Sequence, residues 1–104
     1  VLGNDGNMPV DVEIQGTDFA GDPITWTLAT TPAKDTYSLF ADVGEAGTYS
    51  IEVKKSDYNN LTTDLAAGTT IKWSMKFTAP TEFDAAEAGD VKTATVTLVA
   101  SEHT

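Results

Sequence analysis

The stretch Gly68–Pro80, GTTIKWSMKFTAP, decides the fold class of this 104-residue chain. Its large apolar side chains fall at every second position, namely Ile71, Trp73, Met75 and Phe77. A period of two over about ten residues is typical of a β-strand with one buried and one solvated face. A strand with so large an apolar face needs a second layer to cover it. We therefore expect the rest of the chain to supply a facing sheet.

Other stretches repeat this alternation and predict further strands. Val10, Val12 and Ile14 alternate with acidic or amide side chains, and the stretch near the C-terminus carries outward threonines, which favour strands. The stretch 37–41 is the weakest, because two large apolar residues are adjacent in it and its inward parity is unclear. The predicted strands are Met8–Gln15, Ile24–Leu28, Tyr37–Ala41, Thr48–Lys54, Gly68–Pro80 and Val91–Ala100.

Two stretches lack a period of two. Ser56–Ala67 contains Leu61 and Leu65, whose spacing fits either one turn of helix or a loop pinned over an open end of the sheets. Phe83–Ala88 predicts a short helical turn, which Gly89 would end.

Short strands separated by turns, without a long helix, predict an all-β fold. The expected architecture is an antiparallel immunoglobulin-like (Greek-key) β-sandwich of about seven strands. A closed barrel is the alternative. We expect residues 1–104 to form a single β-sandwich domain, processed or excised from a longer secreted protein, because Val1–Leu2 reads as the tail of a strand.

Composition excludes several functional classes. The chain has 16 acidic and 6 basic residues, a formal net charge of −10 and no cysteine. Such a charge repels nucleic acid and anionic lipid headgroups, so we expect no nucleic-acid partner and no direct membrane insertion. The absence of cysteine rules out disulfides, thiolate metal sites and thiol catalysis. The acidic surface suits a soluble or cation-binding protein.

No catalytic constellation is visible. His103 is the only histidine and lies next to the C-terminus, where we expect a fraying tail that cannot hold a base in place. The acidic residues fall on outward strand positions or in loops, without an apolar setting that would raise a carboxyl pKa. The sequence therefore predicts that the protein is not an enzyme.

Calcium is the one ion that the composition suggests, since it prefers carboxylate, amide and carbonyl oxygens from loops. None of the acidic stretches has the spacing of an EF-hand loop, so turn formation and solubility are the competing interpretation. The turn containing Asn4, Asp5 and Asn7 is one cluster of oxygen donors. The predicted calcium ligands are Asp18, Asp22, Glu82, Asp84, Glu87 and Asp90.

Two other surface features carry hypotheses. Asn60-Leu61-Thr62 is an N-glycosylation acceptor motif in a stretch that we expect to be an exposed loop. Among the aromatic residues, Trp26 and Trp73 have the inward parity of their strands, which favours core packing over a sugar-stacking platform. Tyr58 lies in a polar stretch and is the candidate for an exposed contact.

The two ends of the chain resemble a known group of domains. The phrase LGNDGNMPVDVEIQGTDF resembles the opening of β-sandwich domains in bacterial and archaeal surface proteins, and AAGTTIKWSMKFTAPTEFDAAEAGDVKTATVTLVAS resembles their closing pair of strands. Similar domains occur in S-layer proteins, adhesins, TasA/camelysin-type biofilm fibre subunits and archaeal pilus relatives. The acidic insert between Pro80 and Val91 departs from this pattern.

The resemblance implies an extracellular or cell-surface protein that assembles without catalysis. In the fibre-forming members a strand of one subunit completes the sheet of the next, by β-augmentation. The expected partners are then copies of the chain or neighbouring surface-protein domains, contacted through edge strands. The alternative is an accessory module that binds a glycan or a protein ligand, with calcium as a stabilising ion.

Overall fold

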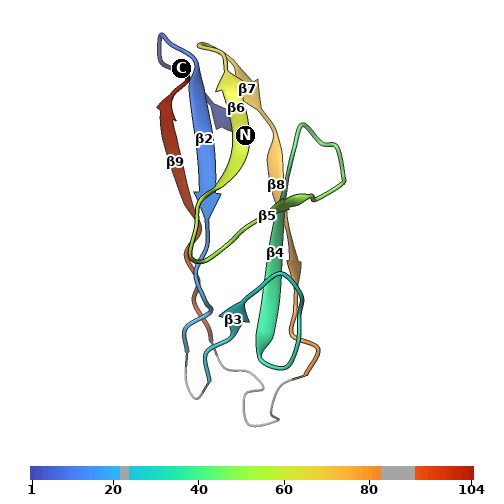
Figure 1. The fold of residues 1–104 in the computed structure, drawn as a ribbon. Coiled ribbons are helices and arrows are strands. Elements are labelled where there is room, and N and C mark those ends of the chain that lie inside the picture. The colour runs from blue at the N-terminus through green and yellow to red at the C-terminus, as the bar shows by residue number, and fades with distance from the viewer. Residues whose placement is uncertain (22–23, 83–90) are drawn as a thin grey trace.

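The computed structural model describes residues 1–21, 24–82 and 91–104. This part of the chain is all-β and contains no helix, and its sheets are mainly antiparallel (Figure 1). The predicted helical turn at Phe83–Ala88 lies outside the described residues. The strands are β1 (Leu2–Gly3), β2 (Val10–Gln15), β3 (Thr27–Leu28), β4 (Thr36–Val43), β5 (Ile51–Glu52), β6 (Asn59–Leu65), β7 (Thr70–Ile71), β8 (Trp73–Thr78) and β9 (Thr97–Glu102).

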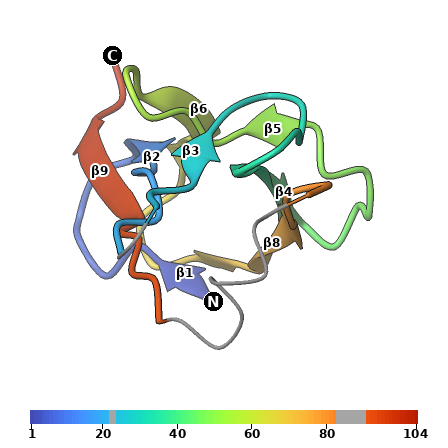
Figure 2. The same ribbon diagram turned by 90° about the horizontal axis from the view of Figure 1, so that it is seen from below.

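The strands are arranged around a common interior. One sheet has the order β6-β2-β9, and the other is built on β4, which pairs with β3, β5 and β8. A third, two-stranded sheet joins β1 to β7. Figure 2 looks along the strands and shows the first sheet on one side of the interior and the β4 sheet on the other. The molecule is elongated, with extents of 51 × 23 × 21 Å.

The core is centred on β4 and β2. Tyr37, Leu39 and Ala41 project inward from β4, and Val12 and Ile14 project inward from β2; all five are buried. The alternation of Val10, Val12 and Ile14 was predicted correctly, but the strand begins at Val10, and Met8, which the predicted strand included, is 42% exposed. In β4 the odd-numbered residues face the core and Phe40 does not, which resolves the parity that the adjacent Leu39 and Phe40 left open in the sequence.

The prediction for Gly68–Pro80 is right about which side chains point toward the core and wrong about how fully those side chains are buried. In the β4–β8 register, Met75 lies opposite Ala41 and Phe77 opposite Leu39. Directly opposed residues project to the same side of a sheet, so Met75 and Phe77 do point to the core face. Their side chains nevertheless remain 40% and 48% exposed. The reason is that β8 pairs with β4 on one side only, and no described strand covers its other side.

Several strands are shorter than predicted. Thr48–Lys54 contributes only Ile51–Glu52, because Tyr49 has a φ of 47° and leaves the extended conformation. Val91–Ala100 is replaced by Thr97–Glu102, which extends two residues further toward the C-terminus than predicted. The predicted strand Ile24–Leu28 is reduced to Thr27–Leu28.

The prediction of a helical turn or loop at Ser56–Ala67 is wrong. Most of this stretch forms β6, which pairs with β2 and buries both Leu61 and Leu65. Side chains four residues apart share a face in a strand as well as in a helix, so their spacing did not distinguish the two. No helix in the described ranges is long and apolar enough to cross a lipid bilayer.

Candidate interaction surface

The predicted calcium ligands are not brought together in the part of the chain that the structure describes. Asp22, Asp84, Glu87 and Asp90 lie outside it. The carboxylate of Asp18 accepts a hydrogen bond of 2.8 Å from the backbone N–H of Leu28 and lies 3.5 Å from the ammonium of Lys55. Glu82 is exposed, and its carbonyl accepts a backbone bond from Asp35. Within residues 1–21, 24–82 and 91–104 no group of three or more metal-ligating side chains forms. Calcium binding stays a prediction.

The Asn4 turn has a structural role. The side chain of Asn4 is buried, and its amide donates to the carbonyls of Met8 and Leu65 at 2.8 and 2.9 Å. Its oxygen accepts from the N–H of Gly6 at 3.0 Å. Asn4 therefore ties the β1–β2 turn to the end of β6, and its oxygen is already engaged by the backbone.

His103 is held in place, against the expectation of a fraying tail. Its backbone N–H donates to the carbonyl of Pro9 at 3.0 Å, and its Nδ1 lies 2.7 Å from Oδ1 of Asp11. The N–H of Asp64 donates to the same oxygen at 2.9 Å. The pairing of β9 with β2 brings the tail to Asp11, because Glu102 lies opposite Val10. The sequence contained no clear signal for this, since the alternation of the last strand stops at Leu98-Val99-Ala100, before Ser101 and Glu102.

The Asp11–His103 pair shifts both groups toward their charged forms. The hydrogen bond to Asp11 raises the pKa of His103 above its ordinary value of 6.5. The hydrogen bond from the Asp64 N–H, followed by that from His103, lowers the pKa of the Asp11 carboxyl. Together with the backbone bond to Pro9, the pair fastens the C-terminal end to β2.

Fastening of the tail should depend on pH. Because the folded pKa of His103 is raised, the stabilisation is fully present below pH 6.5 and is lost as the pH rises through the folded pKa. We expect the melting temperature of the wild type to exceed that of His103→Gln below pH 6.5, and the gap to close at higher pH. Thermal denaturation of both proteins across this range measures it. If the difference in melting temperature between the two proteins were the same at all pH values above the titration of Asp11, the Asp11–His103 ion pair would be contradicted.

Asn60 is exposed, but it lies in β6 and not in a loop. It stands opposite Glu13 of β2, and its backbone N–H bonds to the side chain of Asn59 at 2.9 Å. The third residue of the motif, Thr62, is half-buried. The prediction that Asn60 lies in a loop is wrong. Glycosylation of Asn60 stays a prediction.

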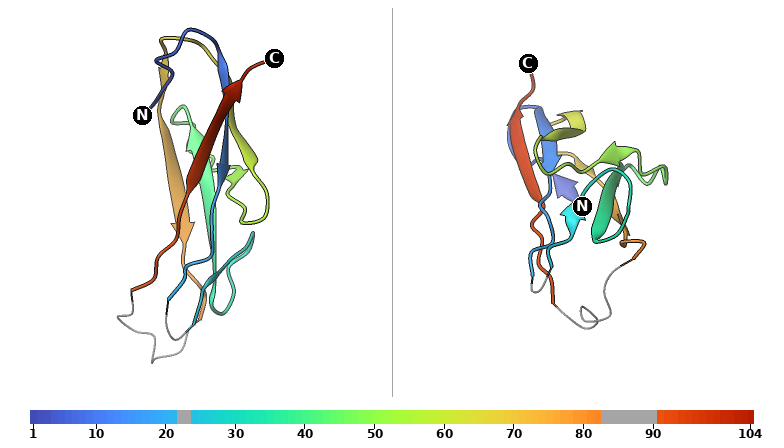
Figure 3. Two further views of the ribbon diagram at one scale, coloured as in Figure 1. Left: turned by 90° about the vertical axis from the view of Figure 1, so that its left-hand side faces the viewer. Right: turned by 60° about the horizontal axis from the view of Figure 1, so that its bottom comes forward.

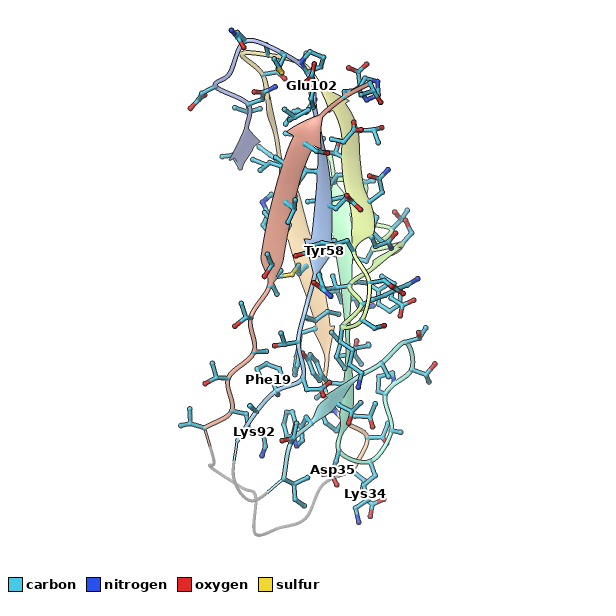
Figure 4. All side chains as sticks on the ribbon, turned by 60° about the vertical axis from the view of Figure 1, so that its left-hand side comes forward. Phe19, Lys34, Asp35, Tyr58, Lys92 and Glu102 are labelled. Atoms are coloured by element: carbon cyan, nitrogen blue, oxygen red, sulfur yellow. The ribbon has the colours of Figure 1, made fainter. Side chains whose placement is uncertain are left out.

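The aromatic side chains divide as the parity argument suggested. Trp26 and Trp73 are partly buried and pack against the core, whereas Tyr58 is 43% exposed. Phe19 packs on Tyr37 with ring centroids 4.6 Å apart and meets Phe77 edge-on at 5.9 Å. Figure 4 shows Phe19 and Lys92 toward the same end of the molecule, away from Glu102. These aromatics form a core cluster whose outer margin is the exposed ring of Phe77.

One edge of β8 is free of a partner strand among the described residues, and it is the candidate interaction surface. The carbonyl of Lys72 accepts a bond of 2.8 Å from Gly44, so its backbone groups face the β4 side. Backbone groups alternate in direction along an antiparallel strand, which turns the N–H and C=O groups of Trp73, Met75 and Phe77 to the opposite side. Among the described residues no strand pairs there. This edge, Trp73–Phe77, is called the β8 edge below.

Within the part of the chain that the structure describes, the β8 edge combines unpaired backbone groups with exposed apolar side chains. Met75 and Phe77 lie on the core face and are substantially exposed, while Lys76 is exposed on the other face. A hollow of about 370 Å³ lies at the N-terminal end of the β8 edge and is lined by Val1, Glu45, Lys72, Trp73 and Ser74. Sequence reasoning did not find this site, because alternation shows which face a residue takes but not whether a neighbour covers it.

Comparison with known proteins adds no assignment. No family model, curated protein or solved structure shows a significant match to the chain.

Proposed function

We propose that this protein is a non-catalytic assembly domain of a cell-surface layer, pilus or biofilm fibre, which associates with copies of itself or with neighbouring surface domains through edge strands. The proposal includes an extracellular location and an immunoglobulin-like Greek-key arrangement of the sheets. The observation that carries it is the β8 edge, where exposed core-face side chains lie beside backbone groups that no strand among the described residues pairs with. Such an edge is a template for another strand unless it is covered.

Residues elsewhere support an assembly role more than a catalytic one. The carboxylate of Asp18 and the single histidine are both engaged in contacts that fasten loops or ends. The two main sheets run along the long axis of the molecule, so strand addition at β8 would extend one of them (Figure 3). Extending a sheet adds main-chain hydrogen bonds and covers apolar side chains together.

Association through an edge makes the mass of the protein depend on its concentration. We expect the weight-average mass, measured by light scattering after size-exclusion chromatography, to rise with concentration, and electron microscopy to show ordered assemblies. A Met75→Lys, Phe77→Lys double variant should remain monomeric, because inward charges at an edge oppose pairing. Met8→Lys is the matched control, since Met8 is also 42% exposed but lies in the turn between β1 and β2, outside any strand. A strictly monomeric wild type would count against the proposal.

A binding module is the second candidate, and one observation favours it. A hollow of about 280 Å³ beside the β4–β8 pair is lined by residues that include Phe40, Tyr49 and Lys76. The ring of Tyr49 is fixed there by a hydrogen bond of 3.1 Å between its hydroxyl and that of Ser74. Aromatic faces beside hydroxyl groups suit a glycan. Screening the protein and a Tyr49→Ala variant on a glycan array tests this role.

A further inference from the structure

We propose that the β8 edge receives one extended strand that runs antiparallel to β8, continues the line of β1, and alternates apolar with acidic residues. The inference rests on the proposed function, in which edge strands make the contacts. It adds the receiving edge, the direction of the partner strand and the chemistry of its two faces.

The direction and register follow from β1. Leu2 lies opposite Ile71 and Gly3 opposite Thr70, so β1 runs antiparallel to β7. If this register is extended by one residue toward the N-terminus, Val1 lies opposite Lys72, which immediately precedes the β8 edge. A strand that continues this line passes Trp73, Met75 and Phe77 in turn. Figure 2 shows β1 on the side of the molecule between β8 and β9, which is where this strand would lie.

The backbone at this edge is ready for such a strand. The N–H and C=O groups of Trp73, Met75 and Phe77 face away from β4, as the Lys72–Gly44 bond establishes. The neighbouring pair Ile71 and Leu2 already uses the same edge. An incoming strand would therefore extend an existing ladder and would not have to start a new one.

The side chains set an alternating pattern. Residues of the partner strand opposite Met75 and Phe77 project to the core face, where 40% and 48% of those two side chains is exposed. Apolar residues at these positions would cover them and close the interior beside the Phe19–Tyr37–Phe77 cluster.

The lysines set the other half of the pattern. Lys72 and Lys76 are two of the six basic residues of the chain, and both project to the outer face. Lys72 is paired with Glu45 at 2.9 Å, while Lys76 has no ion pair within the described residues. Pairing of two β8 edges would bring these cations together, which disfavours self-pairing of β8. An acidic residue opposite Lys76 is favoured instead, and this selects an alternating apolar and acidic segment.

Titration of the protein with a short synthetic peptide that alternates valine and glutamate tests the inference. The control peptide has the same composition with its valines grouped together. We expect calorimetric binding of the alternating peptide alone. Binding should weaken at least about tenfold in Phe77→Ser and in Lys76→Glu. Val99→Ser and Lys54→Glu are the matched controls, because both positions are exposed and lie away from the β8 edge.

Amide hydrogen exchange identifies the edge independently of affinity. On peptide binding, the amides of Trp73, Met75 and Phe77 should become protected, whereas those of Ser74 and Lys76 already face β4 and should change little. Equal binding of the grouped peptide, unchanged affinity of Phe77→Ser, or protection without this alternation would each overturn the inference. Self-pairing of β8 is the competing occupant. It predicts the same protection at rising protein concentration without peptide, and that result would also overturn the inference.

The strand site and the proposed assembly function can fail independently of each other. Assembly that is indifferent to Phe77→Ser would leave the proposed function standing and refute the strand site. Peptide binding at β8 by a protein that never assembles would support the strand site and count against the proposed function.

Discussion

Replacing Tyr37 with alanine should lower the free energy of unfolding by about 3–5 kcal/mol, the range for removing a large buried aromatic side chain. Tyr37 is fully buried at the start of β4 and is the largest such side chain among the described residues. Its ring lies 4.6 Å from that of Phe19 and 5.7 Å from that of Phe77, so the substitution opens a cavity between the strands. Chemical denaturation of both proteins measures the loss, which is large for a domain of this size.

The hydroxyl of Tyr37 can be tested apart from the ring. It donates to the carbonyl of Thr17, and in Tyr37→Phe that carbonyl loses its partner. We expect this variant to lose only about 1 kcal/mol. Tyr58→Ala is the control for an aromatic residue outside the core, and should change stability by no more than about 0.5 kcal/mol. A loss in Tyr58→Ala equal to that in Tyr37→Ala would show that the core is not centred on β4.

The same hydroxyl gives the fold an alkaline limit. Burial, and then the charge of Asp18, raise the pKa of Tyr37 from 10.0 to about 12. Between these values the unfolded chain ionises while the folded protein keeps the proton, so stability falls as the pH rises from 10 through 12. Stability of Tyr37→Phe should fall less steeply across this range. An identical slope in both proteins would contradict the assignment.

Replacing Asn4 with alanine should cost about 2–3 kcal/mol, because three hydrogen bonds are lost around a buried position. The buried carbonyl of Leu65 loses the amide donor of Asn4, and the loss of hydrogen bonds to buried groups carries most of the cost. Asn4→Asp should be at least as destabilising, since a carboxylate cannot donate to the carbonyls of Met8 and Leu65. Denaturation midpoints of the three proteins measure both effects.

Asn7→Ala is the matched control for Asn4. Asn7 belongs to the same turn and is exposed. Its replacement should change stability by no more than about 0.5 kcal/mol. If Asn4→Ala were as mild, the turn would be held by its backbone alone.

The fold class was predictable because alternation is local and β2 shows it cleanly. Val12 and Ile14 are buried as their spacing indicated, and Met75 and Phe77 point to the face that their spacing indicated. Their exposure was not predictable, because it depends on whether another strand lies beside β8. The role of β4 was missed for a related reason: Leu39 and Phe40 are both apolar, and only the pairing with β8 and β5 distinguishes their faces.

The sites depended still more on contacts between distant residues. The clusters predicted to bind calcium were chosen by proximity in sequence, and Asp18 is instead engaged by Leu28 and Lys55. His103 looked free because it lies near the end of the chain, yet the β2–β9 register carries it to Asp11. Proximity along the chain says little about such partners when most contacts join different strands.

The unequal lengths of the β1–β7 and β2–β9 ladders have a mechanical consequence. β1 is joined to β7 through two residue pairs, whereas β9 is joined to β2 through a continuous register from Thr97 to Glu102. The C-terminal end of β9 lies beside the start of β2, where Glu102 is opposite Val10, so a pull between the two chain ends opens this ladder one bond at a time over its six residue pairs. On the N-terminal side the β1–β7 ladder has two residue pairs, and the hydrogen bonds of Asn4 hold the chain behind it. Under tension the molecule therefore yields first at β1 and is then held at Asn4.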